Sequence, residues 1–226
     1  MYFEFLVEDL SGKALIDTIM RKIKDKHPDV DYRCKSFGGI GGYKKHGKAT
    51  SAKTGKLLND LPHYLCGFNK SLKNNPDTTV FIVLDNDTRN VEEFRSLLQN
   101  ISLENLITID HVYCIAIEET EAWLLGDEAA IKAAYPRAKL PVLRSYVQDS
   151  ICNTWEKLAD VVYPGGFNRM KKDCTTYAEI GRMKSEWAEK IGLYMDLECN
   201  RSPSFNFFIG ELNKRIISTQ PQVKSG

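Results

Sequence analysis

The alternation of short apolar runs with helical patterns constrains the fold of this chain more than any other feature. Helices are expected from Ser11 onward, at 57–72 with a break or kink at Pro62, at about 91–98 and at 118–135, because apolar residues recur there at helical spacing. Runs rich in strand-forming residues separate these segments and lie at 2–7, 30–37, 79–84 and 111–117. This order predicts an α/β fold with a mostly parallel four-stranded sheet flanked by helices.

Strand patterns fade after Tyr135, and the remaining sequence predicts a helical region that packs on the sheet. Helices are expected after Pro203 and at 141–149, 153–162 and 174–195, and the Pro-Gly-Gly sequence predicts a loop at 163–173. The predicted organisation is an α/β core over 1–135, a helical C-terminal region over 136–217 and a disordered tail over 218–226.

Composition and charge limit the class of protein. The chain has 226 residues and a formal net charge of +1, so any nucleic-acid contact has to come from a local basic patch. None of its six cysteines forms a Cys-x-x-Cys pair, and reduced thiols are expected. The first residues are acidic where a secretory signal is basic, and no apolar run reaches the roughly 20 residues of a membrane span. We therefore expect a cytoplasmic protein without membrane contact.

Acidic residues follow three of the four predicted strands. They are Glu8 and Asp9 after the first run, Asp85 and Asp87 after the third, and Glu118, Glu119 and Glu121 after the fourth. The carboxyl ends of parallel strands share one edge of a sheet, so these carboxylates are expected to lie close together. Crowded carboxylates repel one another, and a divalent cation relieves the repulsion.

The acids have a metal-binding and a purely structural interpretation. Mg²⁺ prefers oxygen ligands, and two ions about 3.5–4 Å apart stabilise both the attacking and the leaving oxygen of a phosphodiester. Asp85 and Asp87 lie two positions apart and could bracket two such ions. The alternative for Asp87 is a turn or the cap of the next helix. The alternative for the three glutamates is a helix N-terminus, where the dipole favours acids.

At these positions the sequence resembles a Toprim domain, the catalytic α/β fold of topoisomerases, DnaG-type primases and overcoming-lysogenization-defect (OLD) nucleases. The Toprim motifs, a Glu after the first strand and Asp-x-Asp after the third, correspond to Glu8 and to Asp85-Asn86-Asp87. The first motif usually reads Val-Glu-Gly, but here Asp9 follows Glu8 in place of glycine. The carboxylate of Asp9 could compete for metal.

The chain resembles more closely an uncharacterised Toprim-like group of bacterial proteins encoded beside ABC-type ATPases in defence loci. Two further stretches carry this resemblance, Glu119-Thr120-Glu121-Ala122-Trp123-Leu124-Leu125-Gly126-Asp127 and Asn200-Arg201-Ser202-Pro203-Ser204-Phe205. The chain is too short for the tyrosine domain of a topoisomerase or for the additional parts of a primase. A nuclease needs only the metal site and a phosphate-binding surface.

The resemblance thus implies a nuclease dependent on Mg²⁺ or Mn²⁺, a hydrolase of phosphodiester bonds in DNA or RNA. Glu8 would act as general base or metal ligand, and Asp85 and Asp87 would hold one or both ions. Glu119 and Glu121 would complete the second metal site. Lys184 would stabilise the developing phosphorane charge, and a plain helix-surface lysine is the alternative.

A glycine- and lysine-rich loop over 38–56 contains no acidic residue and follows the second strand. We expect its lysines to bind the nucleic-acid backbone, and a solvated flexible loop is the alternative. These lysines are Lys44, Lys45, Lys48, Lys53 and Lys56.

The resemblance also implies an ABC-type or AAA-like ATPase as partner, within an ATPase-linked anti-phage defence system, and the chain could form a homo-oligomer. Two other functions stay open. One is a non-catalytic Toprim-fold subunit that docks on the ATPase, and the other is a nucleotide-binding or nucleotidyl-transferring enzyme that uses the same metals.

Overall fold

The computed structural model describes residues 1–44, 48–49 and 55–218, and at residues 43, 44, 48 and 49 it describes the backbone alone. Its strands are β1 (Tyr2–Val7), β2 (Asp31–Ser36), β3 (Tyr43–Lys44), β4 (Lys48–Ala49), β5 (Thr78–Asp85) and β6 (His111–Ala116). Its helices are α1 (Leu10–Lys26), α2 (Leu57–Ser71), α3 (Val91–Glu104), α4 (Glu121–Leu125), α5 (Glu128–Ala134), α6 (Leu140–Arg144), α7 (Thr154–Val162), α8 (Phe167–Asp173), α9 (Tyr177–Gly192) and α10 (Pro203–Ser218).

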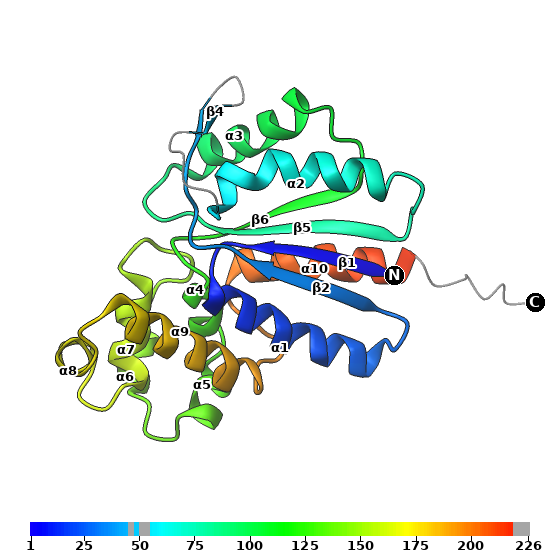
Figure 1. Ribbon diagram of the computed structural model, residues 1–226. Helices are drawn as coiled ribbons and strands as arrows, with labels where there is room; N and C mark the ends of the chain where they lie inside the picture. The colour runs from blue at the N-terminus through cyan, green and yellow to red at the C-terminus, as the bar shows by residue number, and fades with distance from the viewer. Residues whose placement is uncertain (45–47, 50–54, 219–226) are drawn as a thin grey trace, which may run out of the picture.

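Four parallel strands form the central sheet in the order β2-β1-β5-β6, with helices on both faces (Figure 1). The predicted α/β fold with a four-stranded parallel sheet is therefore confirmed. Because β1 and β5 occupy the centre, the acids that follow them emerge beside each other. Strands β3 and β4 form a separate antiparallel pair.

Alternate residues of the central strands enter two different cores. Leu6, Ile82 and Leu84 pack with the buried side chains of α2 and α3 on one face. Phe5 and Phe81 pack on the other face with α1, α9 and α10. All eight residues of β5 are buried, which explains why its sequence is an almost continuous apolar run.

Several predicted helix bounds were wrong. Pro62 does not break α2, which continues from Leu57 to Ser71 with Leu61 and Leu65 buried. The helix expected over 118–135 is two helices, because the side chain of Asp127 caps the new N-terminus of α5. The loop expected at 163–173 contains α8, and the helix expected at 141–149 is confined to α6.

Helices from the C-terminal part complete the core of the sheet. Trp123 of α4 stacks on Phe208 of α10 with ring centroids 5.1 Å apart, and Phe208 also contacts the ring of Phe81 in β5. The predicted division after Tyr135 stays a prediction, and of the predicted tail only Ser218 is described, as the last residue of α10. Within the described residues, no helix combines the length and hydropathy that a membrane crossing requires.

Candidate active site at the carboxyl edge of the sheet

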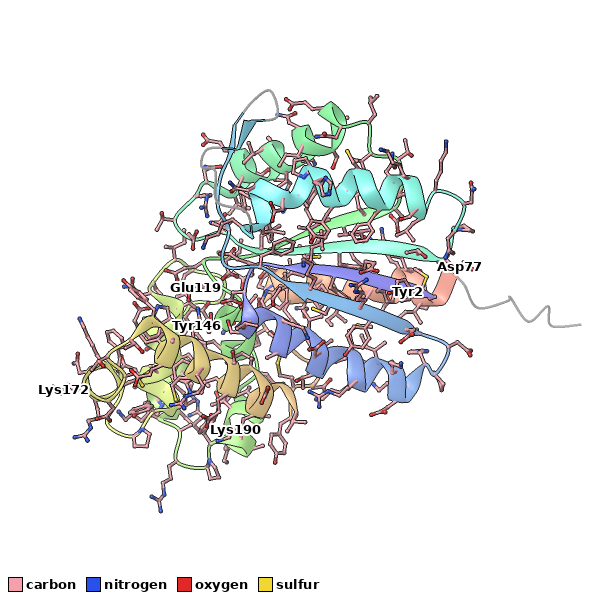
Figure 2. The ribbon with its side chains drawn as sticks, viewed as in Figure 1. Tyr2, Asp77, Glu119, Tyr146, Lys172 and Lys190 are labelled. Carbon is pink, nitrogen blue, oxygen red and sulfur yellow. The ribbon has the colours of Figure 1, made fainter. Side chains whose placement is uncertain are left out.

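Main-chain hydrogen bonds tie the acidic strand ends together. The Asp85 N–H donates to Glu8 Oε2 at 3.1 Å, and the Thr120 N–H donates to Asp85 Oδ1 at 3.0 Å. These bonds connect the ends of β1, β5 and β6. Figure 2 shows Glu119 at the opposite end of the sheet from Tyr2 and Asp77. We call the set Glu8, Asp85, Glu119 and Glu121 the acid edge.

Lys184 brings a positive charge to the acid edge from α9. Its Nζ lies 3.2 Å from Glu121 Oε2 and 3.5 Å from Glu119 Oε2. Only 13% of the Lys184 side chain and 2% of the Glu121 side chain are exposed. Lys184 is therefore not a helix-surface lysine, and that alternative was wrong. Its position results from the packing of α9 on α1 and α4, which no local pattern encodes.

Burial favours the neutral form of each acid at this edge. It raises the pKa of Glu8 to about 7, and the nearby Asp87 and Asp9 add to the rise. Burial and the neighbouring Glu121 raise the pKa of Glu119 to about 8. The pKa of Asp85 lies well above its usual value, mainly because the carboxyl group is buried and secondly because the charge of Glu8 is near.

The charges of the acid edge are not balanced by Lys184. Burial opposes its ammonium charge, but Glu121 and Glu119 raise its pKa above the ordinary value. Glu119 Oε2 and Glu121 Oε2 are both buried, and the cation beside them is Lys184 Nζ, at 3.5 and 3.2 Å. One ammonium thus faces two buried carboxylates, and proton uptake or a further cation would compensate the second of them.

These donors fit Mg²⁺ or Mn²⁺ in chemistry, since they are all carboxylate oxygens. Their arrangement is not that of a preassembled metal centre. Over residues 1–44, 48–49 and 55–218, no three Asp, Glu, His or Cys side chains are placed to hold one ion together. A divalent ion would have to draw Glu119 and Glu121 away from Lys184.

Asp87 differs from the buried acids. It has a left-handed backbone (φ +48°), its N–H donates to the Glu118 carbonyl at 2.8 Å, and its carboxylate pairs with Arg89. Its side chain is 46% exposed. The cap of α3 is Asn90, which accepts two backbone N–H bonds, so the interpretation of Asp87 as a helix cap was wrong.

Two further acids at this edge hold the backbone. The carboxylate of Glu118 accepts the N–H groups of Cys152, Asn153 and Thr154 at 2.8–3.0 Å and also the Thr154 hydroxyl. Asp9 Oδ1 accepts the Gly12 N–H at 2.8 Å and caps α1. Both carboxylates are engaged in structural bonds, in contrast to Glu119 and Glu121.

Sequence reasoning missed Glu156 of α7. Its Oε2 is buried and has no hydrogen-bond partner among the described residues. Its charge contributes to the raised pKa of Glu119, so it belongs to the same electrostatic cluster. A single Glu on an amphipathic helix carries no motif, and its proximity to the sheet depends on how α7 packs.

The basic loop is described only in part. Lys56 donates a hydrogen bond from Nζ to the Gly38 carbonyl. Lys44 and Lys48 belong to the β3–β4 pair, where the backbone alone is described. Lys45 and Lys53 lie outside the described residues. Nucleic-acid binding by these five lysines stays a prediction.

The two stretches that carry the closer resemblance pack against each other. Asn200 Nδ2 donates to the Trp123 carbonyl at 2.8 Å, and Trp123 Nε1 donates to Ser204 Oγ at 2.9 Å. A Cβ atom on Gly126 would lie 1.9 Å from Asn200 Oδ1, so this contact requires glycine. We call this contact between the end of α4 and the residues before α10, at Gly126 and Asn200, the joint. The joint holds α4, and with it Glu121, against the start of α10.

Comparison with models of protein families, with curated proteins and with solved structures gave no match to this chain.

Proposed function

We propose that this protein is a divalent-metal-dependent nuclease that hydrolyses phosphodiester bonds at the acid edge. The observation that supports the proposal most is the excess of buried negative charge. The carboxylates of Glu119 and Glu121 lie beside Lys184, and the charges of Asp85 and Asp9 also act on it, so acids that follow three strands share one lysine. A dication bound to phosphate oxygens would fit this excess of negative charge.

The residue roles follow from burial and pKa. Asp85, Glu119 and Glu121 would hold Mg²⁺ or Mn²⁺, and a bound ion would activate water and polarise the phosphate. Glu8 would accept the proton of the attacking water, since its raised pKa of about 7 suits a general base. Lys184, released from its ion pair, would bind a phosphate oxygen. Asp87 would contribute from the exposed rim.

A non-catalytic docking subunit is the second candidate. The Lys184 ion pair favours it, because a lysine already lies beside Glu119 and Glu121, where a metal ion would bind. The ATPase partner and the defence role rest on the family resemblance alone, and the resemblance does not choose between DNA and RNA. The nucleotidyl-transferring alternative also rests on the resemblance alone.

The test combines cleavage with metal binding. Plasmid, single-stranded DNA and tRNA are incubated with the protein and Mg²⁺ or Mn²⁺, with EDTA as the metal-free arm. Asp85→Asn and Glu121→Gln should lower the cleavage rate by about 10²–10³-fold. Glu189→Gln, an exposed residue on α9, should leave the rate unchanged.

Isothermal titration calorimetry with Mn²⁺ separates the two candidates. A nuclease binds the ion, and Asp85→Asn weakens the binding. Cleavage that persists in EDTA or in Asp85→Asn would refute the site assignment. Absence of both Mn²⁺ binding and cleavage of the three substrates, alone and with the cognate ATPase, would favour the docking subunit.

A further inference from the structure

A second candidate site lies at the other end of the sheet. A cavity of about 690 Å³ opens between α3 and α10 beside the first residues of β6. His111 begins β6, whereas the acid edge follows the carboxyl ends of the strands. The volume falls within the roughly 300–1,000 Å³ of small-molecule sites. This cavity is thus at a different place in the fold from the proposed nuclease centre.

Large apolar side chains surround the mouth of this cavity. Leu103, Leu106 and Phe207 line it and are 71%, 79% and 44% exposed. Leu106 has a left-handed backbone (φ +52°) just after the end of α3, a position where glycine is favoured. A leucine there costs conformational energy and adds no burial, yet it places an apolar group at the mouth.

A directed hydrogen-bond chain lies in the wall. His111 Nδ1 is 2.9 Å from the Ile109 carbonyl, which can only accept, so Nδ1 carries the hydrogen. In the neutral ring, Nε2 then accepts from Ser102 Oγ at 2.8 Å. Ser102 Oγ in turn accepts the hydroxyl hydrogen of Tyr113 at 2.7 Å. The oriented Ser102 oxygen keeps one lone pair and is a fixed polar point inside an apolar wall.

Arg95 supplies a positive charge to the cavity, which Arg215 and Glu211 also line. Arg215, the other lining arginine, pairs with Asp110 and Glu211 at 2.5 and 2.7 Å. Arg95 makes no ion pair and no side-chain hydrogen bond with any residue that the structure describes. A half-buried guanidinium without an acid partner is a binding group for a carboxylate or phosphate.

We propose that this cavity binds a small molecule with an apolar or aromatic body and one anionic group. The body contacts Leu103, Leu106 and Phe207, and the anion pairs with Arg95. The Ser102 oxygen accepts a hydrogen bond from a donor on the ligand.

Two fluorescent probes test the proposal. 8-Anilinonaphthalene-1-sulfonate carries an aromatic body and an anion, and N-phenyl-1-naphthylamine has the same body without the anion. The sulfonate should bind the wild-type protein at one site per chain. Arg95→Met should weaken this binding about tenfold and leave the neutral probe unaffected. The control Arg137→Met replaces an exposed arginine away from the cavity and should change neither.

A second variant tests the location. Gln99 is exposed on α3 and lines the cavity, so Gln99→Trp fills the mouth without disturbing the core. Both probes should lose binding in Gln99→Trp, while circular dichroism and the melting temperature stay as in the wild type. Unchanged binding in Gln99→Trp overturns the site, and unchanged sulfonate binding in Arg95→Met overturns the anion contact. Absence of sulfonate binding to the wild-type protein overturns the whole proposal.

Discussion

Single carboxylates at the acid edge are held in an environment that suits their neutral form. Asp85 is buried between the Glu8 carboxylate and the Thr120 N–H, and Glu119 faces Glu121. A folded protein tolerates such groups when another ligand or a proton compensates them. Proton uptake, which the raised pKa values describe, and the proposed metal are therefore two ways to compensate the same buried carboxyl groups.

Stability should fall as pH rises in the absence of metal. Glu8 and Glu119 keep a proton in the folded state up to pKa values of about 7 and 8, whereas in the unfolded chain they lose it near 4.5. Between about pH 4.5 and 8 the folded protein holds more protons, so the free energy of unfolding decreases by about 1.4 kcal/mol per pH unit for each additional bound proton. Urea denaturation in EDTA at pH 5 and pH 8 measures this, and the double variant Glu8→Gln, Glu119→Gln should flatten the difference. A steeper fall in the double variant would contradict the assignment.

Lys184→Met should destabilise the protein strongly. It leaves Glu119 and Glu121 buried without their cation, at a cost of about 3–5 kcal/mol at pH 8. The loss should be smaller at pH 5, where these carboxylates can take up protons. Lys190→Met is the matched control on the same helix, since Lys190 pairs with the half-exposed Glu186 and should cost less than about 1 kcal/mol. Equal losses in the two variants would argue against a buried ion pair.

At the scale of elements, the contact between α4 and the start of α10 determines where Glu121 points. Gly126 ends α4 beside Asn200, and the side chain of Asn200 bonds back to the Trp123 carbonyl. A change at this joint moves a helix rather than a single side chain.

Two glycines test the joint. Gly126→Ala places a Cβ into Asn200 and should lower the free energy of unfolding by about 1–3 kcal/mol. Gly181 lies inside α9, where an added Cβ would meet no atom within 4 Å outside the backbone of its own helix, and Gly181→Ala should raise stability by about 0.5–1 kcal/mol. Chemical denaturation of both variants measures the difference. A stable Gly126→Ala protein would mean that the α4–α10 contact yields easily.

The elements that could be predicted from sequence are those with a local signal. The apolar run of β5 predicts a strand buried on both faces. Asp85, at the end of this run, is then expected at the carboxyl edge of the sheet. The start of α5 also had a sequence signal, because aspartate is a common N-terminal cap of helices. The Asp127 side chain accepts the Ala130 N–H, and the prediction of one helix over 118–135 missed this cap. Glu156 had none, because the packing of α7 that brings it to the acid edge is not encoded in helical periodicity. The burial of Lys184 depends on α9 packing in the same way.

At the scale of the whole molecule, one hydrophobic core joins the sheet to the later helices. Phe5 and Phe81 of the central strands share it with Trp187 of α9 and with Phe205 and Phe208 of α10. The sheet face that carries Phe5 and Phe81 is therefore covered by residues from both ends of the chain.

Unfolding should accordingly be a single transition. Urea denaturation followed by far-ultraviolet circular dichroism and by tryptophan fluorescence should give the same midpoint, because Trp123 and Trp187 lie in the shared core. A fragment of residues 1–135 should show no cooperative transition, since it leaves Phe5 and Phe81 without α10. Separate midpoints, or a cooperatively folding fragment, would instead show two independent units and support the predicted division after Tyr135.

The joint between Gly126 and Asn200 also governs the moment at which the acid edge can form during protein synthesis. A ribosome that has translated the whole sheet, which ends at Ala116, has not yet synthesised Lys184 or Asn200. The nascent chain then has its strand-end carboxylates but neither the buried lysine nor the contact that orients α4. The acid edge can therefore be completed only after α9 and α10 have been synthesised and have docked on the sheet.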